Sequence, residues 1–143
     1  LFRSKSISKY AGRFLAELEE LRSLDIHAVM NGVFTPEGTS SEIETTRSPL
    51  SELLGQELIT IGIEQWEPRK TDELSTTEAL RLLSDLSAWC RFGPSPIGDG
   101  WFPAAGYRRD APYPVVSLTA PGLVAARSLL GERGCRWWKR SRR

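Results

Sequence analysis

Histidine and cysteine are scarce in this chain of 143 residues, which contains one histidine, His27, and two cysteines, Cys90 and Cys135. A structural zinc site needs four Cys or His ligands at short paired spacings, and these three residues are too few and too far apart. Serine triads, cysteine–histidine pairs and two-histidine metalloprotease helices would all depend on His27. We therefore expect no metal, no cofactor and no catalytic residue of these classes. Carboxylate or arginine chemistry needs no histidine, so the composition leaves an enzyme of that kind open.

The single histidine lies two positions after an acid. On a strand, Asp25 and His27 would point to the same face, because side chains alternate. Such a pair could act as an oriented general base. The alternative is a histidine at a helix end or in a hairpin that makes ordinary hydrogen bonds. We expect this second, structural role.

Long apolar runs are also missing, and none approaches the roughly 20 residues that cross a bilayer, so we expect no membrane span. A content of 40% hydrophobic and 26% charged residues is typical of a globular chain, and the length fits one domain. We expect a single α+β domain over residues 1–132, followed by a basic tail over residues 133–143.

The location of the protein is indicated only by composition. The low cysteine content favours an intracellular protein. Residues 1–16 contain four basic residues and no acid, a composition that organelle transit segments share. Helical spacing that continues into the following acidic part favours instead the basic start of a first helix.

Hydrophobic periodicity and capping residues predict about four helices and a small antiparallel sheet. The clearest strand covers residues 57–66, where isoleucines alternate with polar residues. The other expected elements are a helix over residues 8–24, a hairpin at Asn31-Gly32 or the end of a longer first helix there, a short helix opened by Ser48 and Pro49, a helix with a Ser75/Glu78 capping box that reaches Cys90, and a helix over residues 120–130 capped by Thr119.

Proline and glycine are concentrated in residues 93–114, which hold five prolines and four glycines. Twenty-two residues are too many for a plain connector in a compact domain, so this segment is a functional loop or a disguised hairpin. We expect residues 101–107 to pair with residues 115–118. If the loop docks a protein partner, its aromatic side chains are the candidate contacts: Trp101, Phe102 and Tyr107.

Residues 115–122, with the sequence VVSLTAPG, resemble the end of a winged-helix DNA-binding domain, where a wing hairpin returns into a closing helix. The resemblance implies that Arg108 and Arg109 would be phosphate contacts at the wing tip. The rest of the chain departs from that pattern. A winged helix joins two helices by a short turn before the wing, and here the isoleucine-rich strand and an acidic linker separate the two candidates.

The net charge of +1 conceals a strong polarity along the chain. Residues 17–78 contain fourteen acids against four bases, whereas residues 133–143 contain six bases and no acid. Arginine binds phosphate in bidentate fashion and tryptophan stacks on bases, so the tail is typical of a nucleic-acid contact. The candidate binding residues of the tail are Arg133, Arg136, Trp137, Trp138, Lys139, Arg140, Arg142 and Arg143.

The same basic and aromatic residues fit other partners. An acidic protein groove or an anionic membrane surface would attract them, and the tail could fold back on the acidic part of its own chain. We expect a non-catalytic binding protein that engages nucleic acid, RNA or DNA, in a larger assembly. The alternatives are a protein-interaction module that docks through residues 93–114, and an enzyme with carboxylate or arginine chemistry. The sequence does not indicate the oligomeric state.

Overall fold

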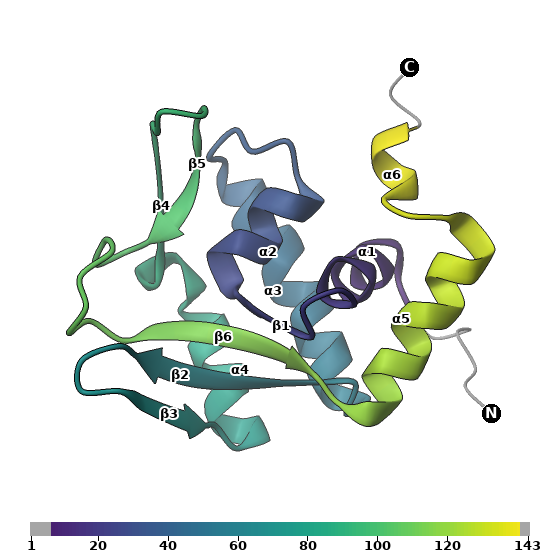
Figure 1. The fold of residues 1–143 in the computed structure, drawn as a ribbon, viewed down its shortest axis with the longest axis horizontal. Helices are drawn as coiled ribbons and strands as arrows, with labels where there is room; N and C mark the ends of the chain where they lie inside the picture. Colours follow the sequence, from purple (N-terminus) through teal and green to yellow (C-terminus); the bar gives the residue numbers. More distant parts are fainter. Residues whose placement is uncertain (1–6, 141–143) are drawn as a thin grey trace.

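The computed structural model describes residues 7–140 and has the expected α+β architecture (Figure 1). Helices cover one face of a four-stranded antiparallel sheet, and a separate two-stranded hairpin stands at one end of the molecule. The elements in chain order are α1 (Lys9–Leu18), β1 (Ser23–Asp25), α2 (Ile26–Val33), α3 (Ser40–Gly55), β2 (Ile59–Gln65), β3 (Lys70–Glu73), α4 (Thr76–Ser84), the 3-10 turn η2 (Leu86–Ala88), β4 (Cys90–Gly93), β5 (Gly100–Pro103), β6 (Tyr113–Leu118), α5 (Ala120–Arg133) and α6 (Trp137–Arg140).

The main sheet has the strand order β1-β6-β2-β3, with every neighbouring pair antiparallel. The strand predicted over residues 57–66 is confirmed as β2, and its alternation sorts the two faces of the sheet. Ile59 and Ile61 are buried against the helices, opposite Leu118 and Val116 of β6. The intervening side chains of β2, including Glu64, lie on the other face and are half-buried.

Helix α1 forms the centre of the helical layer. Phe14, Leu15 and Leu18 are fully buried, and the helix packs against α2, α3 and α5. The helix ends at Leu18, six residues before the predicted end, because the chain turns at residues 19–22 into the short strand β1. Burial on several sides explains why α1 lacks a side-chain hydrogen bond at its N-cap yet is stable.

The hairpin predicted at Asn31-Gly32 is wrong, because both residues belong to helix α2. The Asn31 side chain bonds to both backbone groups of Trp101, as the backbone of a neighbouring strand would. It donates from Nδ2 to the Trp101 carbonyl at 3.0 Å and accepts from the Trp101 N–H at 2.8 Å. Gly32 lies against α1, where an added Cβ would come within 2.1 Å of the Glu17 carboxylate. Both residues therefore make tertiary contacts from within a helix. The alternative of a longer first helix that ends at Gly32 is also wrong, because α1 ends at Leu18 and Gly32 belongs to α2.

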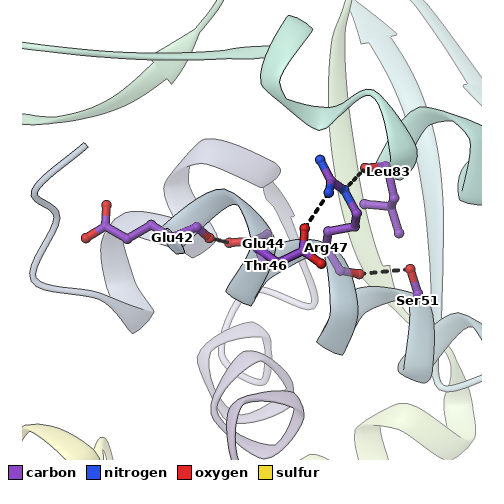
Figure 2. A network of polar contacts seen from close by, with 6 residues as sticks. All are labelled: Glu42, Glu44, Thr46, Arg47, Ser51 and Leu83. Atoms are coloured by element: carbon purple, nitrogen blue, oxygen red, sulfur yellow. Dashed lines mark hydrogen bonds and ion pairs between the residues drawn. The ribbon is translucent and has the colours of Figure 1, made fainter. Parts of the chain in front are cut away.

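Helix α3 begins at Ser40, not at Ser48, and continues through Pro49. Thr39 is its N-cap, and its side chain accepts a bond from the Glu42 N–H. Arg47 links this helix to the end of α4 by donating from Nε to the Leu83 carbonyl at 2.8 Å, while it also pairs with Glu44 (Figure 2). Packing of α3 against α1 and α4 offsets the cost of an interior proline.

The capping box predicted for Ser75 and Glu78 is confirmed at the start of α4. The helix ends at Ser84, however, and does not reach Cys90. A 3-10 turn over η2 reverses the chain, and Cys90 begins strand β4 with its thiol buried. Most of the apolar residues predicted for one helix face over residues 79–90 are buried, but they belong to α4, η2 and β4.

The hairpin predicted between residues 101–107 and 115–118 is also wrong. Strand β5 pairs with β4, whereas β6 pairs with both β1 and β2 in the main sheet. The chain thus has no wing at this place. Residues 104–112 instead cross from the two-stranded hairpin to the main sheet at the edge of the molecule (Figure 1).

The predicted N-cap of the last long helix is confirmed. The Thr119 hydroxyl accepts from the Gly122 N–H at 3.0 Å and donates to the Glu57 carbonyl at 2.7 Å. Gly122 lies so close to the start of β2 that an added Cβ would come within 1.9 Å of the Leu58 carbonyl oxygen. The corner between β6 and α5 therefore has no room for a side chain.

Two glycines of α5 form a matched pair for a stability test. Gly122→Ala forces backbone apart, and we expect it to lower the free energy of unfolding by about 1–3 kcal/mol. Gly131→Ala, in the same helix with nothing within 4 Å of its added Cβ, should raise it by up to about 1 kcal/mol. Urea unfolding measures both. Equal effects of the two substitutions would contradict the close approach.

Candidate binding site

A pocket of about 120 Å³ lies where the main sheet meets the loop over residues 104–112. It is smaller than the roughly 300–1,000 Å³ of sites for drug-sized ligands, so it suits a single side chain or small head group. Three of its lining residues are aromatic and two are charged. The lining residues are Asp25, Trp66, Pro103, Gly106, Tyr107, Arg108 and Tyr113.

The sheet register explains how distant residues meet in this pocket. Tyr113 of β6 lies opposite Glu64 of β2, and Asp25 of β1 lies opposite Val115, two residues further along β6. Because side chains alternate, these positions share the face of the sheet that the helices do not cover. Trp66 follows directly after β2, and the loop over residues 104–112 brings Tyr107 to the same place.

The aromatic side chains of the pocket are partly exposed and mutually oriented. Trp66 is 61% exposed and Tyr107 is 71% exposed. The Trp66 indole donates from Nε1 to the Tyr113 hydroxyl at 2.7 Å, and that hydroxyl donates to Glu64 Oε1 at 3.4 Å. Tyr107 contacts the rings of His27 and Phe102 edge to face, each at a centroid distance of 6.0 Å. The rings are therefore held in place while surface remains available to a ligand.

Two carboxylates, Asp25 in the pocket lining and Glu64 next to it, form no ion pair with the lining residue Arg108. The guanidinium groups nearby are already used, because Arg108 pairs with Asp110 at 3.2 Å and Arg109 pairs with Glu67 at 3.0 Å. Within residues 7–140, no lysine or arginine lies within ion-pair distance of Asp25 or Glu64.

Burial, and next the negative charge of Glu64, raise the pKa of Asp25 above its ordinary value. The pKa of the Tyr113 hydroxyl is raised as well, mainly by burial and further by the charges of Asp25 and Glu64. Burial is the largest cause of both shifts, the neighbouring negative charges add to it, and the hydrogen bond from Trp66 opposes the shift of Tyr113. A cation placed between these groups would lower the pKa of Asp25 again.

His27 lies beneath the pocket, in the first turn of α2, and its side chain is buried. Its Nε2 is 3.8 Å from Asp25 Oδ2, which is longer than a hydrogen bond. Desolvation lowers the pKa of the imidazole to about 4, so the ring is neutral at physiological pH. This geometry favours the structural role that we expected for His27 over an oriented general base.

Helix α6 lies on the opposite side of the molecule from the loop that joins β5 to β6 (Figure 1). Trp138 is only 5% exposed, and Trp137 packs partly buried against the core. Arg133 lies over the Trp137 ring at 5.4 Å, and Arg136 pairs with the buried Glu17 at 3.0 Å. For these residues the arrangement corresponds to the alternative in which the tail folds back on its own chain.

The remaining basic residues of the tail follow Trp138 in the sequence. Lys139 is half-exposed in α6. Arg140 ends that helix, and its side chain is not described. Arg142 and Arg143 lie outside the described residues.

The three aromatic residues predicted to dock a partner have different environments. Trp101 is 4% exposed, and its indole donates from Nε1 to the buried carboxylate of Glu42 at 2.9 Å. Phe102 is half-buried beneath the guanidinium of Arg91. Only Tyr107 presents a large exposed surface, and it does so at the pocket together with Arg108.

Sequence reasoning missed three residues of this site: Glu64, Trp66 and Tyr113. The alternation of β2 placed Glu64 and Trp66 on the polar face of the strand, so the signal for two of them was present. Tyr113 could not be added, because its position depends on the pairing of β6 with β2 across nearly 50 residues.

Comparison of the chain with protein families, with curated proteins and with solved structures finds no match. Over residues 7–140, no group of three or more His, Cys, Asp or Glu side chains is arranged to hold a metal ion. No helix in the same part of the chain has the length and apolar character to cross a membrane. Both cysteines are free thiols, and burial raises the pKa of the Cys90 thiol to about 12.

The buried histidine makes folding stability depend on pH. Its folded pKa of about 4 lies below the ordinary 6.5, so the folded state resists a proton that the unfolded state accepts. Stability should fall as the pH drops from 6.5 to 4, with His27 contributing about 3 kcal/mol of the loss. His27→Phe should remove this contribution in urea unfolding at stepped pH, with His27→Gln as a second variant. The same pH dependence in all three proteins would refute the assignment.

Proposed function

We propose that this chain is a non-catalytic binding module that docks a basic segment of a protein partner around the aromatic pocket. The observation that carries the proposal is the grouping of exposed aromatic surface with uncompensated carboxylates. Trp66 and Tyr107 are among the most exposed large side chains of the described residues, and both line the same small pocket. Tryptophan and tyrosine are enriched among the residues that dominate protein–protein binding.

Charge favours a basic partner over an acidic one. Strand β3 forms the sheet edge next to β2, and its four exposed side chains include Asp72 and Glu73 together with Lys70. Asp25 lines the pocket, and Glu64 lies next to it, where its carboxylate accepts from the hydroxyl of the lining residue Tyr113. Complementary charge speeds association and selects against partners of the same sign. A basic segment at the pocket would bring its cations next to Asp25 and Glu64, which pair with no lysine or arginine of residues 7–140, whereas Asp72 on β3 already pairs with Lys70 at 3.5 Å.

Site-specific crosslinking tests the docking surface. We expect a photoreactive phenylalanine analogue at position 107 to capture a protein whose crosslinked peptide, identified by mass spectrometry, is rich in lysine and arginine. Glu64→Gln and rising salt should weaken the capture, since both remove the electrostatic attraction. The same analogue at Val124, an exposed position on α5, is the matched control. Capture of an acidic peptide, of a second copy of this chain, or equally from both positions would contradict the proposal.

Nucleic-acid binding through the C-terminal segment is a second proposal. The observation that favours it is a segment that holds six bases and no acid, four of which, Lys139, Arg140, Arg142 and Arg143, follow the packed tryptophans. Because Trp137 and Trp138 pack on the body, their rings would have to leave the core to stack on bases. Binding would then rest on contacts between arginine or lysine and phosphate, which carry little sequence information.

A charge-matched pair of variants tests this second proposal while leaving both tryptophans in place. We expect glutamine at Lys139, Arg140, Arg142 and Arg143 to weaken RNA or DNA binding and to reduce the magnitude of the log–log salt slope by about 3–4. Glutamine at four exposed bases elsewhere, Arg22, Arg69, Lys70 and Arg81, removes the same charge and should leave the slope unchanged. Fluorescence anisotropy at several salt concentrations measures both. Equal slopes for the two variants would overturn the proposal.

A further inference from the structure

We propose that the pocket is an aromatic cage for a methylated ammonium group on a lysine side chain of the partner. The ring-lined walls would surround the cation, and Asp25 and Glu64 would supply the opposite charge. This inference rests on the proposed docking of a basic protein segment at the same pocket, and it specifies the group that enters the pocket.

The lining provides the groups that stabilise an organic cation. Trp66, Tyr107 and Tyr113 are the three aromatic members, and tryptophan and tyrosine are the rings whose faces attract cations most strongly. Their relative positions are fixed by the bond from the Trp66 indole to the Tyr113 hydroxyl and by the contact between Tyr107 and His27. A cage that is organised before binding loses less conformational entropy when the ligand enters.

Hydrogen bonding argues for a methylated ammonium over an arginine. A guanidinium carries five N–H donors that need acceptors when it is buried. The Tyr113 hydroxyl is already bonded to Trp66 and to Glu64, and Pro103 and Gly106 bring no side-chain acceptor, so Asp25 is the lining acceptor left and can take only part of the five donors. A fully methylated ammonium has no N–H to satisfy, and its charge is spread over methyl groups that pack against rings. The small volume of about 120 Å³ fits one such head group.

The positive charge of Arg108 allows a cation site to be distinguished from a phosphate site. Arg108 lines the pocket, and its guanidinium is held by two bonds of 3.2 Å to Asp110. If the loop bound phosphate, as the wing-tip role implied, removing Arg108 would weaken the binding of a phosphate ligand. If the pocket binds a cation, removing a nearby positive charge strengthens it. Arg108→Gln should therefore raise the affinity for a cation if the pocket is a cage, and lower the affinity for phosphate if the loop is a phosphate site.

The first experiment uses a cation and its neutral isostere as probes. Choline and 3,3-dimethylbutan-1-ol, which has carbon in place of the charged nitrogen, are titrated into the ¹⁵N-labelled full chain while the Trp66 indole N–H resonance is followed. We expect saturable shifts with choline and at least tenfold weaker binding of the neutral alcohol. Tyr107→Ala and Asp25→Asn should each weaken choline binding severalfold, Arg108→Gln should strengthen it, and Val124→Ala should leave it unchanged. Equal binding of the two probes, or weaker binding in Arg108→Gln, would overturn the cage.

The second experiment separates the cage from the docking function. A lysine-rich peptide carrying one trimethyllysine is compared with the same peptide carrying lysine or arginine at that position. Tightest binding of the trimethyllysine peptide, lost in Tyr107→Ala, supports the cage. Equal binding of the three peptides, with the crosslinks at position 107 retained, would refute the cage and leave the docking surface standing. Choline binding without peptide binding would instead refute the protein partner and identify a small-molecule site.

Discussion

The pairing of β6 with two strands at once is the constraint on which this structure depends. Residues 113–118 lie between β1, near the N-terminus, and β2, near the middle of the chain. This central position buries Val116 against the helices and places Tyr113 on the opposite face, in line with Glu64 and close to Asp25. The hydrophobic core and the candidate site therefore lie on opposite faces of the same paired strands. A change of register by one residue would move the side chains of β6 from each face to the other.

A buried carboxylate holds the other wall of the site in position. Glu42 of α3 accepts bonds from the backbone N–H groups of Glu37 and Gly38 and from the Trp101 indole. This network fixes the hairpin of β4 and β5 against the helical layer, and Asn31 ties the same hairpin to α2. Pro103, at the end of β5, then reaches the pocket from a rigid support. A preformed binding site on a small domain requires such fixed walls.

Local signals in the sequence predicted local structure well and long-range pairing poorly. The alternation of β2, the Ser75/Glu78 capping box and the Thr119 cap depend on neighbours within a few residues, and all three are present in the structure. Asn31-Gly32 and Pro49 have strong local preferences for turns, yet both lie in helices because contacts with Trp101 and with α1 and α4 outweigh them. The partners of β5 and β6 had no local signal. The pocket depends on those partners, so only Tyr107, Arg108 and the Asp25–His27 spacing could be singled out beforehand.

The strand order also has a consequence for how the chain is made. Strand β1 pairs only with β6, and one edge of β2 is paired only by β6. During synthesis β1 and β2 leave the ribosome long before residues 113–118. The four-stranded sheet therefore cannot form until most of the described chain has been translated. Unpaired edges are the usual starting points of misassembly between chains. The polar, charged strand β3 directly follows β2 in the chain and pairs with the other edge of β2, so that edge does not depend on β6.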